Sequence, residues 1–224
     1  MTLRHPTFKI SQPTGHFHKD ELSLTLIHNN SPLIIDPGTS TYSGNTKLRN
    51  QLRSVESHST FFLKNSENQI SDDPKKLFEL RRKEINSFGN GGLMHANIKS
   101  NNFEQQRQIS FLDDAQKICV EDSWVFQKKI KAQTLSWNWV FAENIIVEKR
   151  SSYSWTVTTK SNESFLLSST VPLNVDAWLC SSGYTDIKTC YKLTGSISSN
   201  ALSGKVVTTI CTEFDYSSND SMTT

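Results

Sequence analysis

The sequence lacks the features that would mark a membrane-spanning, redox or nucleic-acid-binding protein. No run approaches the roughly 18 apolar residues that a membrane-spanning helix requires. Its four cysteines form no C-x-x-C pair, which disfavours a thiolate zinc site or a redox motif. A formal net charge of +2 gives no argument for nucleic acid or for a membrane surface. We therefore expect neither a membrane span nor a nucleic-acid partner.

Long helical periodicity is also missing, and strand patterns take its place. Residues 22–27 alternate apolar and polar side chains, the period of a half-buried strand, and residues 32–35 return after a polar turn at 28–31. Many short strands separated by turns predict an all-β protein, a large antiparallel β-sandwich. The further segments with strand character are residues 59–63, 93–99, 107–112, 115–124, 134–141, 145–149, 153–160, 164–169, 177–180, 189–194 and 205–212.

The 224 residues suit one domain, because sandwiches often reach about 200–250 residues as a single unit. We expect this domain to span residues 1–214, and the Ser/Asn/Asp/Thr-rich residues 215–224 to form a frayed tail. The polar, irregular stretch from residue 43 to 56 is expected to be a long loop that covers something. It contains Arg49 and Arg53, which are candidates for a locally basic groove that holds an anionic polymer. A solvated, charged edge is the alternative.

The histidines are unevenly placed, since five of the six precede residue 60. His16 and His18 are two residues apart, so on an extended strand they project from the same face. Such a pair suits a metal ion that is approached from one side. An H-x-H pair is by itself a weak signal, because two half-buried, hydrogen-bonded histidines have the same pattern.

Two other residues extend this pattern. Asp36 comes where the strand of residues 32–35 ends, in front of Pro37 and Gly38, where a turn can hold a carboxylate at a sheet edge. An ordinary turn cap is the alternative. His58 lies at the start of the next apolar strand. Two neutral imidazoles and one carboxylate with an open fourth position would suit Zn²⁺.

Three motifs in this order resemble the heparinase II/III-like lyase family. The family carries G-H-x-H-x-D-x-L-S, then a strand ending in D-P-G-T-x-x-Y, then R-x-x-x-R-S-T-x-x-H-N-T. Val55 and Ser59 depart from the third motif, where the family has Thr and Asn. The matching residues, over about 46 positions, are Gly15, His16, His18, Asp20, Leu22, Ser23, Asp36, Pro37, Gly38, Thr39, Tyr42, Arg49, Arg53, Ser54, His58 and Thr60.

The resemblance implies a role for each matching site residue. His16 corresponds to the histidine that faces the substrate in an acid–base or charge-stabilising role. His18, Asp36 and His58 correspond to the ligands of a zinc ion that supports the shape of the site. Tyr42 corresponds to a tyrosine that lines the cleft, and we include it as a candidate catalytic residue; packing or anchoring of its loop is the alternative role.

The implied reaction is β-elimination on a uronate-containing, acidic polysaccharide. In the family, a helical α/α-toroid supplies an Asn or His and a catalytic Tyr. That domain would precede residue 1, so we expect residues 1–224 by themselves to have little or no activity. The family usually works outside the cytoplasm or alongside surface-polysaccharide synthesis, and this sequence assigns no compartment.

Two other functions fit parts of the sequence. One is a non-catalytic, zinc-stabilised sandwich that accompanies or binds glycans. The other is a cupin-type metal enzyme, because H-x-H is followed by Glu21, although the spacing from His18 is short for that barrel. Trp137 and Trp139 share one strand face and could stack on sugars, but we expect them to pack in the core.

Overall fold

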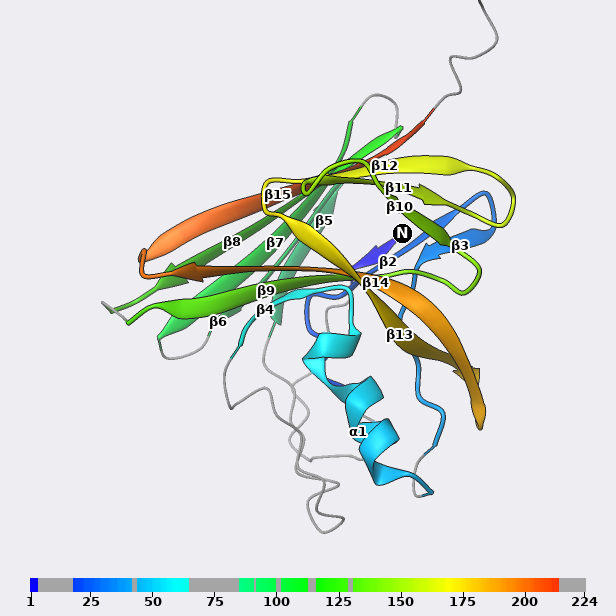
Figure 1. Ribbon diagram of the computed structural model, residues 1–224. Coiled ribbons are helices and arrows are strands. Elements are labelled where there is room, and N and C mark those ends of the chain that lie inside the picture. Colours follow the sequence, from blue (N-terminus) through cyan, green and yellow to red (C-terminus); the bar gives the residue numbers. More distant parts are fainter. Residues whose placement is uncertain are drawn as a thin grey trace, which may run out of the picture.

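The computed structural model describes residues 1–3, 18–41, 44–64, 85–90, 92–99, 102–112, 116–128 and 131–213. In this part of the chain, strands form three antiparallel sheets (Figure 1). The small sheet has the order β1-β2-β3, with β1 Thr2–Leu3, β2 Leu24–His28 and β3 Ser31–Ile34.

The two larger sheets form the layers of a β-sandwich. The eight-stranded sheet has the order β10-β11-β12-β15-β8-β7-β6-β5, and the four-stranded sheet has the order β13-β14-β9-β4. The bounds are β4 Phe61–Leu63, β5 Ile85–Asn90, β6 Leu93–Lys99, β7 Phe103–Leu112, β8 Lys117–Phe126, β9 Gln133–Val140, β10 Ile146–Lys149, β11 Ser154–Thr158, β12 Ser164–Ser169, β13 Leu173–Gly183, β14 Asp186–Ser199 and β15 Ser203–Thr212.

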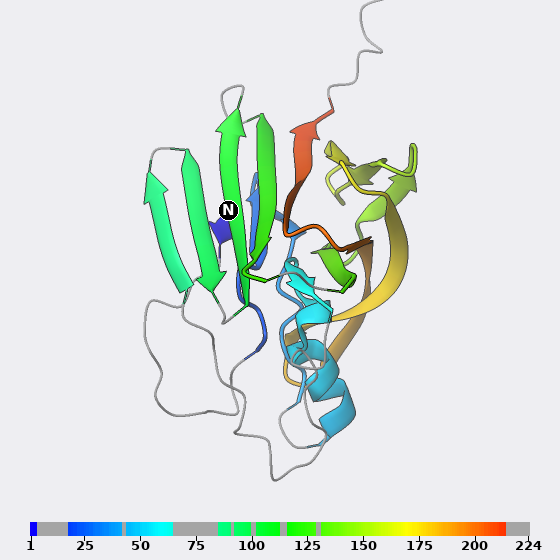
Figure 2. The same cartoon turned by 90° about the vertical axis from the view of Figure 1, so that its left-hand side faces the viewer.

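The core lies between these two sheets. Trp137 of β9 stacks on Phe61 of β4, with ring centroids 5.9 Å apart, and meets the edge of Trp124 of β8 at 6.1 Å. Trp137 and Trp139 are both buried, as expected from the sequence. Figure 2 shows β5–β8 on one side of the molecule and the curved β13 and β14 on the other. The prediction of an all-β antiparallel sandwich is therefore confirmed.

The hairpin between β2 and β3 is also confirmed. Asn29 and Asn30 form its two-residue loop with φ of 44° and 63°. Positive φ at both positions is what a type I′ turn requires, and asparagine tolerates it better than most residues. The structure adds two strands that the sequence pattern did not indicate, β1 and β5.

The prediction of a loop over residues 43–56 is wrong. This stretch holds α1 (Thr46–Arg53), whose N-terminus is capped by the Asn45 side chain accepting from Leu48 N at 3.0 Å, and the 3₁₀ turn η1 (Val55–Ser57). The helix buries Leu52 and two arginines, so its inward face is largely polar. The sequence therefore lacks the regular spacing of apolar residues that would have indicated a helix. Both views place α1 at one end of the sandwich (Figures 1 and 2).

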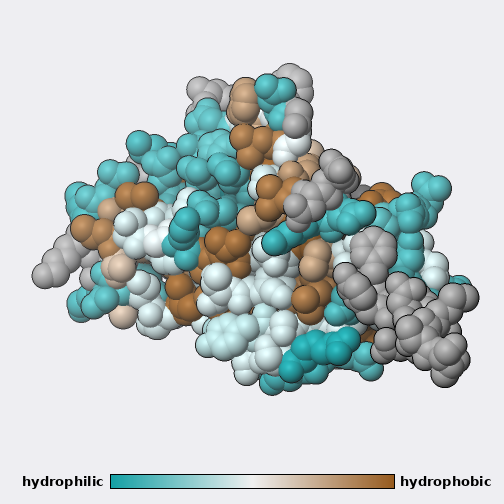
Figure 3. Space-filling model, turned by 90° about the horizontal axis from the view of Figure 1, so that it is seen from above, coloured by the Kyte–Doolittle hydropathy of each residue, from teal (hydrophilic) through white to brown (hydrophobic). Residues whose placement is uncertain are grey.

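Figure 3 shows the molecule from above relative to Figure 1, and this face is mostly hydrophilic with scattered apolar residues. Scattered apolar residues are normal on a protein surface and do not mark a docking patch. In the described residues, no helix combines the length and the apolar character that a bilayer crossing demands.

Candidate metal centre

Three side chains from separate segments converge at one place. His18 precedes β2, Asp36 follows β3, and His58 lies between η1 and β4. One possible ligand atom from each lies within 4.8 Å of the others. The rings of His18 and His58 have centroids 5.3 Å apart, and His58 Nδ1 lies 3.4 Å from Asp36 Oδ2. Two ligand atoms on one tetrahedral Zn²⁺ are about 3.3 Å apart, so small adjustments would let the three share an ion.

Asp36 is held by the turn that follows it. Gly38 N donates to Asp36 Oδ1 at 2.9 Å, and Gly38 has a φ of 68°, a conformation that favours glycine. A Cβ on Gly38 would also collide with the carbonyl oxygen of Ser181 in β13. Ser181 N in turn donates to Pro37 O at 2.8 Å. The turn therefore sits against β13 in a position that only glycine fits.

The surroundings keep Asp36 ionised. Burial alone would raise the pKa of its carboxyl. The His58 imidazole, the Gly38 amide and, less strongly, His18 outweigh burial and hold the pKa well below its usual range. A carboxylate that is deprotonated throughout the neutral range is ready to bind a cation.

His58 is fully buried, and neither ring nitrogen has a hydrogen-bond partner with good geometry. Buried polar atoms are satisfied in the great majority of cases, and each exception needs an explanation. A cation at this position would give one of these nitrogens a partner. The donor set of two imidazoles and one carboxylate therefore fits Zn²⁺.

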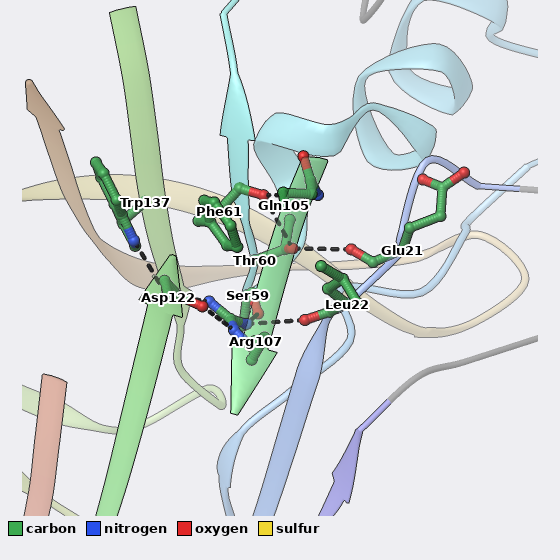
Figure 4. Close-up of polar contacts among 9 residues, drawn as sticks. All are labelled: Glu21, Leu22, Ser59, Thr60, Phe61, Gln105, Arg107, Asp122 and Trp137. Carbon is green, nitrogen blue, oxygen red and sulfur yellow. Dashed lines mark hydrogen bonds and ion pairs between the residues drawn. The ribbon is translucent and has the colours of Figure 1, made fainter. Parts of the chain in front are cut away.

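A buried ion pair fastens the two histidine-bearing segments to the eight-stranded sheet (Figure 4). Arg107 of β7 donates to both carboxylate oxygens of Asp122 in β8, at 2.7 and 2.8 Å. Its Nη1 also donates to Leu22 O at 2.9 Å and to Ser59 O at 2.8 Å. Trp137 Nε1 donates to Asp122 Oδ2 at 3.0 Å. One guanidinium thus contacts a residue next to His58 and a residue four positions after His18.

Leu22 has a φ of 58° and is fully buried, an uncommon conformation for a residue with a side chain. The left-handed region costs about 1–2 kcal/mol for such a residue. Here it aims the Leu22 carbonyl at Arg107, and this charge-assisted hydrogen bond offsets part of the strain.

Backbone contacts complete the frame around the centre. Lys19 N donates to Arg53 O at 2.9 Å, and Leu24 N donates to Ser59 O at 3.0 Å. Thr60 Oγ1 donates to Glu21 O at 2.8 Å. Hydrogen bonds of Lys19, Glu21 and Leu24 therefore connect the segment after His18 to residues before and after His58.

Of the other predicted site residues, only Arg49 and Arg53 lie in the described part of the chain. His16 and Tyr42 lie outside the described residues. Arg49 and Arg53 are on α1 and are almost fully buried, with Arg49 donating to Asn50 Oδ1. Burial and the neighbouring Arg49 lower the pKa of Arg53. A contact between these arginines and a substrate stays a prediction.

Sequence reasoning missed Arg107 and Asp122. Each occupies a buried position in a strand whose neighbours on that face include apolar residues, for example Ile109 and Val120. The two are directly opposite each other in the antiparallel pairing of β7 and β8. The available signal was a pair of opposite charges at inward-facing positions of two adjacent strands. Recognising it requires knowledge of how the residues of the two strands are paired.

Comparison with known proteins identifies the family of this chain. The sequence profile of the family described as Heparinase II/III-like, C-terminal matches residues 7–200. The chain belongs to this family. Membership in the heparinase II/III-like family and the two-layered sandwich leave the cupin alternative without support.

Solved structures share the fold. Heparan sulfate lyase HepC from Pedobacter heparinus matches with a TM-score of 0.70 at 19% identity, over 88% of this chain and 31% of that chain. A heparinase III gene product gives 0.69 at 15%, over 88% and 31%, and a further heparinase III gives 0.67 at 13%, over 87% and 30%. The chain thus spans about a third of these relatives. No curated sequence shows significant similarity to it.

Proposed function

We propose that the chain is the sandwich domain of a lyase that acts on an acidic, uronate-containing polysaccharide, and that His18, Asp36 and His58 hold Zn²⁺. Family membership and the fold shared with a heparan sulfate lyase support the reaction class. The observation that carries the metal site is the convergence of three ligand atoms within 4.8 Å around a fully buried, unsatisfied His58.

The three ligands are suited to this task by their protonation. Asp36 is ionised in the neutral range because His58 and the Gly38 amide stabilise its charge. Each imidazole has to be neutral to offer a lone pair. When bound, the ion would supply a local positive charge that cross-links the segments before β2, after β3 and before β4. His18 follows His16 by two residues, so fixing His18 also restricts where His16 lies.

The chemistry assigned to the site is β-elimination. A base removes the weakly acidic C5 proton of the uronate, and positive groups stabilise the charge that develops on its carboxylate. An acid then protonates the departing glycosidic oxygen. His16 is the proposed base or charge stabiliser, since an imidazole titrates near neutral pH. Tyr42 is proposed to line the cleft, and Arg49 and Arg53 to contribute positive charge beside it.

Residues 1–224 by themselves are expected to be nearly inactive, because the family's helical domain supplies further catalytic groups. A non-catalytic sandwich that keeps the metal as a structural element is therefore the second candidate. The buried ion pair of Arg107 and Asp122 is compatible with both candidates, since it would hold the fold whether or not chemistry occurs.

Metal content and elimination are measured separately to test both candidates. The chain is purified without chelators, and its zinc stoichiometry is determined by elemental analysis for the natural sequence, His58→Ala and the control His95→Ala, whose histidine has no predicted role. We expect one zinc per chain, lost in His58→Ala alone. No bound metal in the natural sequence would refute the metal site.

The elimination assay uses heparan sulfate as the probe and follows the ultraviolet absorbance of the unsaturated uronate product. A slow signal that disappears in His16→Ala supports the lyase. No product from the chain together with a helical domain of a family relative, although zinc is bound, favours the structural candidate and contradicts the lyase.

A further inference from the structure

A second polar site lies on the outer face of the four-stranded sheet. Side chains alternate along β9, so Trp137 faces the core while Ser136 and Asn138 face outward. Together with β13, β14 and the turn η1, they line a pocket of about 260 Å³. The pocket shares no side chain with the His18, Asp36 and His58 cluster. Glu56 on its rim precedes His58 by two residues.

Lys192 of β14 is the unusual member of this pocket. It is only 5% exposed, although it carries an ammonium group. Its Nζ donates to Glu56 O at 3.0 Å and lies 3.2 Å from the ring centroid of Trp178. Within the described part of the chain, no carboxylate lies within ion-pair distance of this nitrogen. Among the described residues, the cation is therefore buried without an ion-pair partner, and its close contacts are a carbonyl oxygen and an aromatic ring.

Such an arrangement is costly, because buried charges are normally paired. Burial lowers the pKa of Lys192 to about 8, although Glu56, Asp176 and Cys190 act in the other direction and Lys64 adds to the lowering. The hydrogen bond to Glu56 O does not explain why a lysine is kept here. That carbonyl already accepts from Asn138 Nδ2 at 3.0 Å. A buried group with a perturbed pKa in a pocket is a functional-site candidate.

The remaining lining suits a hydroxyl-rich ligand. Ser136 and Ser196 offer hydroxyl groups, Asn138 offers an amide, and Trp178 offers an apolar ring. Two carboxylates, Glu56 and Asp176, and two lysines, Lys64 and Lys192, also line the pocket. Thr194 Oγ1 donates to Asp176 Oδ2 at 2.9 Å. The volume is below the roughly 300–1,000 Å³ typical of pockets for drug-sized ligands, so it matches a single sugar ring.

We propose that this pocket binds one acidic sugar residue of a glycan, with Lys192 Nζ neutralising the carboxylate or sulfate group. The ligand supplies the ion-pair partner that Lys192 does not have among the described residues, while the serine and asparagine side chains contact ring hydroxyls. The pocket has the acidic glycan in common with the proposed lyase reaction, but it does not depend on bound metal.

The test uses the full 224-residue chain and isothermal titration calorimetry at neutral pH. The probes are a heparan-sulfate-derived tetrasaccharide and the neutral cellotetraose. We expect measurable binding of the acidic probe alone. Lys192→Met should weaken it by at least about tenfold, the effect of losing one charge-assisted hydrogen bond. Ser196→Trp, which fills the pocket while keeping Lys192, should weaken it to a similar extent.

Lys188→Met is the matched control, since Lys188 lies on the same strand and is paired with Glu143 at 2.9 Å on the surface. It should retain the affinity of the natural sequence. Equal weakening by Lys188→Met and Lys192→Met would mean diffuse charge attraction and would overturn the proposal. So would unchanged affinity in both Lys192→Met and Ser196→Trp, no binding of the acidic probe by the natural sequence, or equal binding of cellotetraose.

His58→Ala separates this proposal from the metal centre. Loss of zinc with unchanged tetrasaccharide binding supports an independent pocket. If His58→Ala loses the tetrasaccharide while Lys192→Met keeps it, the glycan binds at the metal centre, and the pocket proposal is wrong while the lyase proposal stands. If the natural sequence binds no zinc but shows Lys192-dependent binding, the pocket stands and the metal assignment fails.

Discussion

Arg107 and Asp122 face each other across β7 and β8 as a fully buried, two-pronged ion pair, with N–O distances of 2.7 and 2.8 Å. The third nitrogen of the guanidinium, Nη1, donates to the carbonyl oxygens of Leu22 and Ser59. The pair is therefore both a link between strands and the support under the segments that carry His18 and His58.

Removing one member of this pair leaves the other charged and buried. We expect Arg107→Met to lower the free energy of unfolding by about 3–5 kcal/mol, because Asp122 then has no counter-ion. The double variant Arg107→Met, Asp122→Leu should lose less. Urea unfolding of both variants measures the difference, and a double variant as unstable as the single one would contradict this account.

Zinc affinity provides a second measurement for the same residue. Arg107→Lys keeps the charge but cannot reach Asp122, Leu22 and Ser59 with the same geometry. We expect it to bind zinc more weakly than the natural sequence at temperatures where both are folded. The core variant Val157→Ala, in β11, serves as the control for lost stability alone and should bind zinc normally.

Gly38→Ala should disturb the turn that holds Asp36. An alanine there meets an unfavourable φ of 68° and collides with the Ser181 carbonyl oxygen. We expect a loss of about 1–3 kcal/mol in stability and weaker zinc binding. Gly92→Ala is the control, since Gly92 has a φ of 106° with open space around it. If both variants keep full zinc affinity, the turn does not position Asp36.

Zinc should raise the stability of the folded chain by mass action. At a free zinc concentration of about 100 times Kd, the gain is about 2.7 kcal/mol. Adding a chelator should therefore lower the Tm of the natural sequence and of His95→Ala, but not of Asp36→Ala or His58→Ala. Differential scanning calorimetry gives the comparison. Equal chelator sensitivity in all four proteins would place the metal elsewhere.

The pH dependence of stability should report on Lys192. Burial lowers the pKa of Lys192 from 10.5 to about 8, so the unfolded chain binds more protons between these values. Stability contributed by this group therefore rises with pH from about 8 to 10.5, by about 3 kcal/mol at most. Lys192→Met should remove this rise and be at least as stable as the natural sequence at pH 7.

Chemical denaturation at several pH values between 7 and 10 checks the prediction. Other groups that titrate in this range are common to both proteins, so the difference between them isolates Lys192. A constant difference across the range would mean that Lys192 is charged throughout.

Much of the candidate site could be predicted from sequence because its residues stand in short, ordered motifs. His18, Asp36 and His58 were selected from the sequence, and the fold brings them within reach of one ion. The roles of His16 and Tyr42 rest on the motifs alone. Burial of Arg49 and Arg53 on a helix was not foreseen, since their inward face has no apolar period.

The sequence by itself determined the strand class of the fold and the Asn29-Asn30 hairpin turn, because both follow from steric preferences and spacing within a few residues. It also selected His18, Asp36 and His58 as candidate ligands, through three motifs that resemble a known family. Only the tertiary structure decided that Arg107 meets Asp122 beneath Leu22, and that Lys192 is buried against Trp178. Those contacts depend on which strands pair and in what register. Strand pairing and register are determined by the packing of segments that are far apart in the sequence around a shared core.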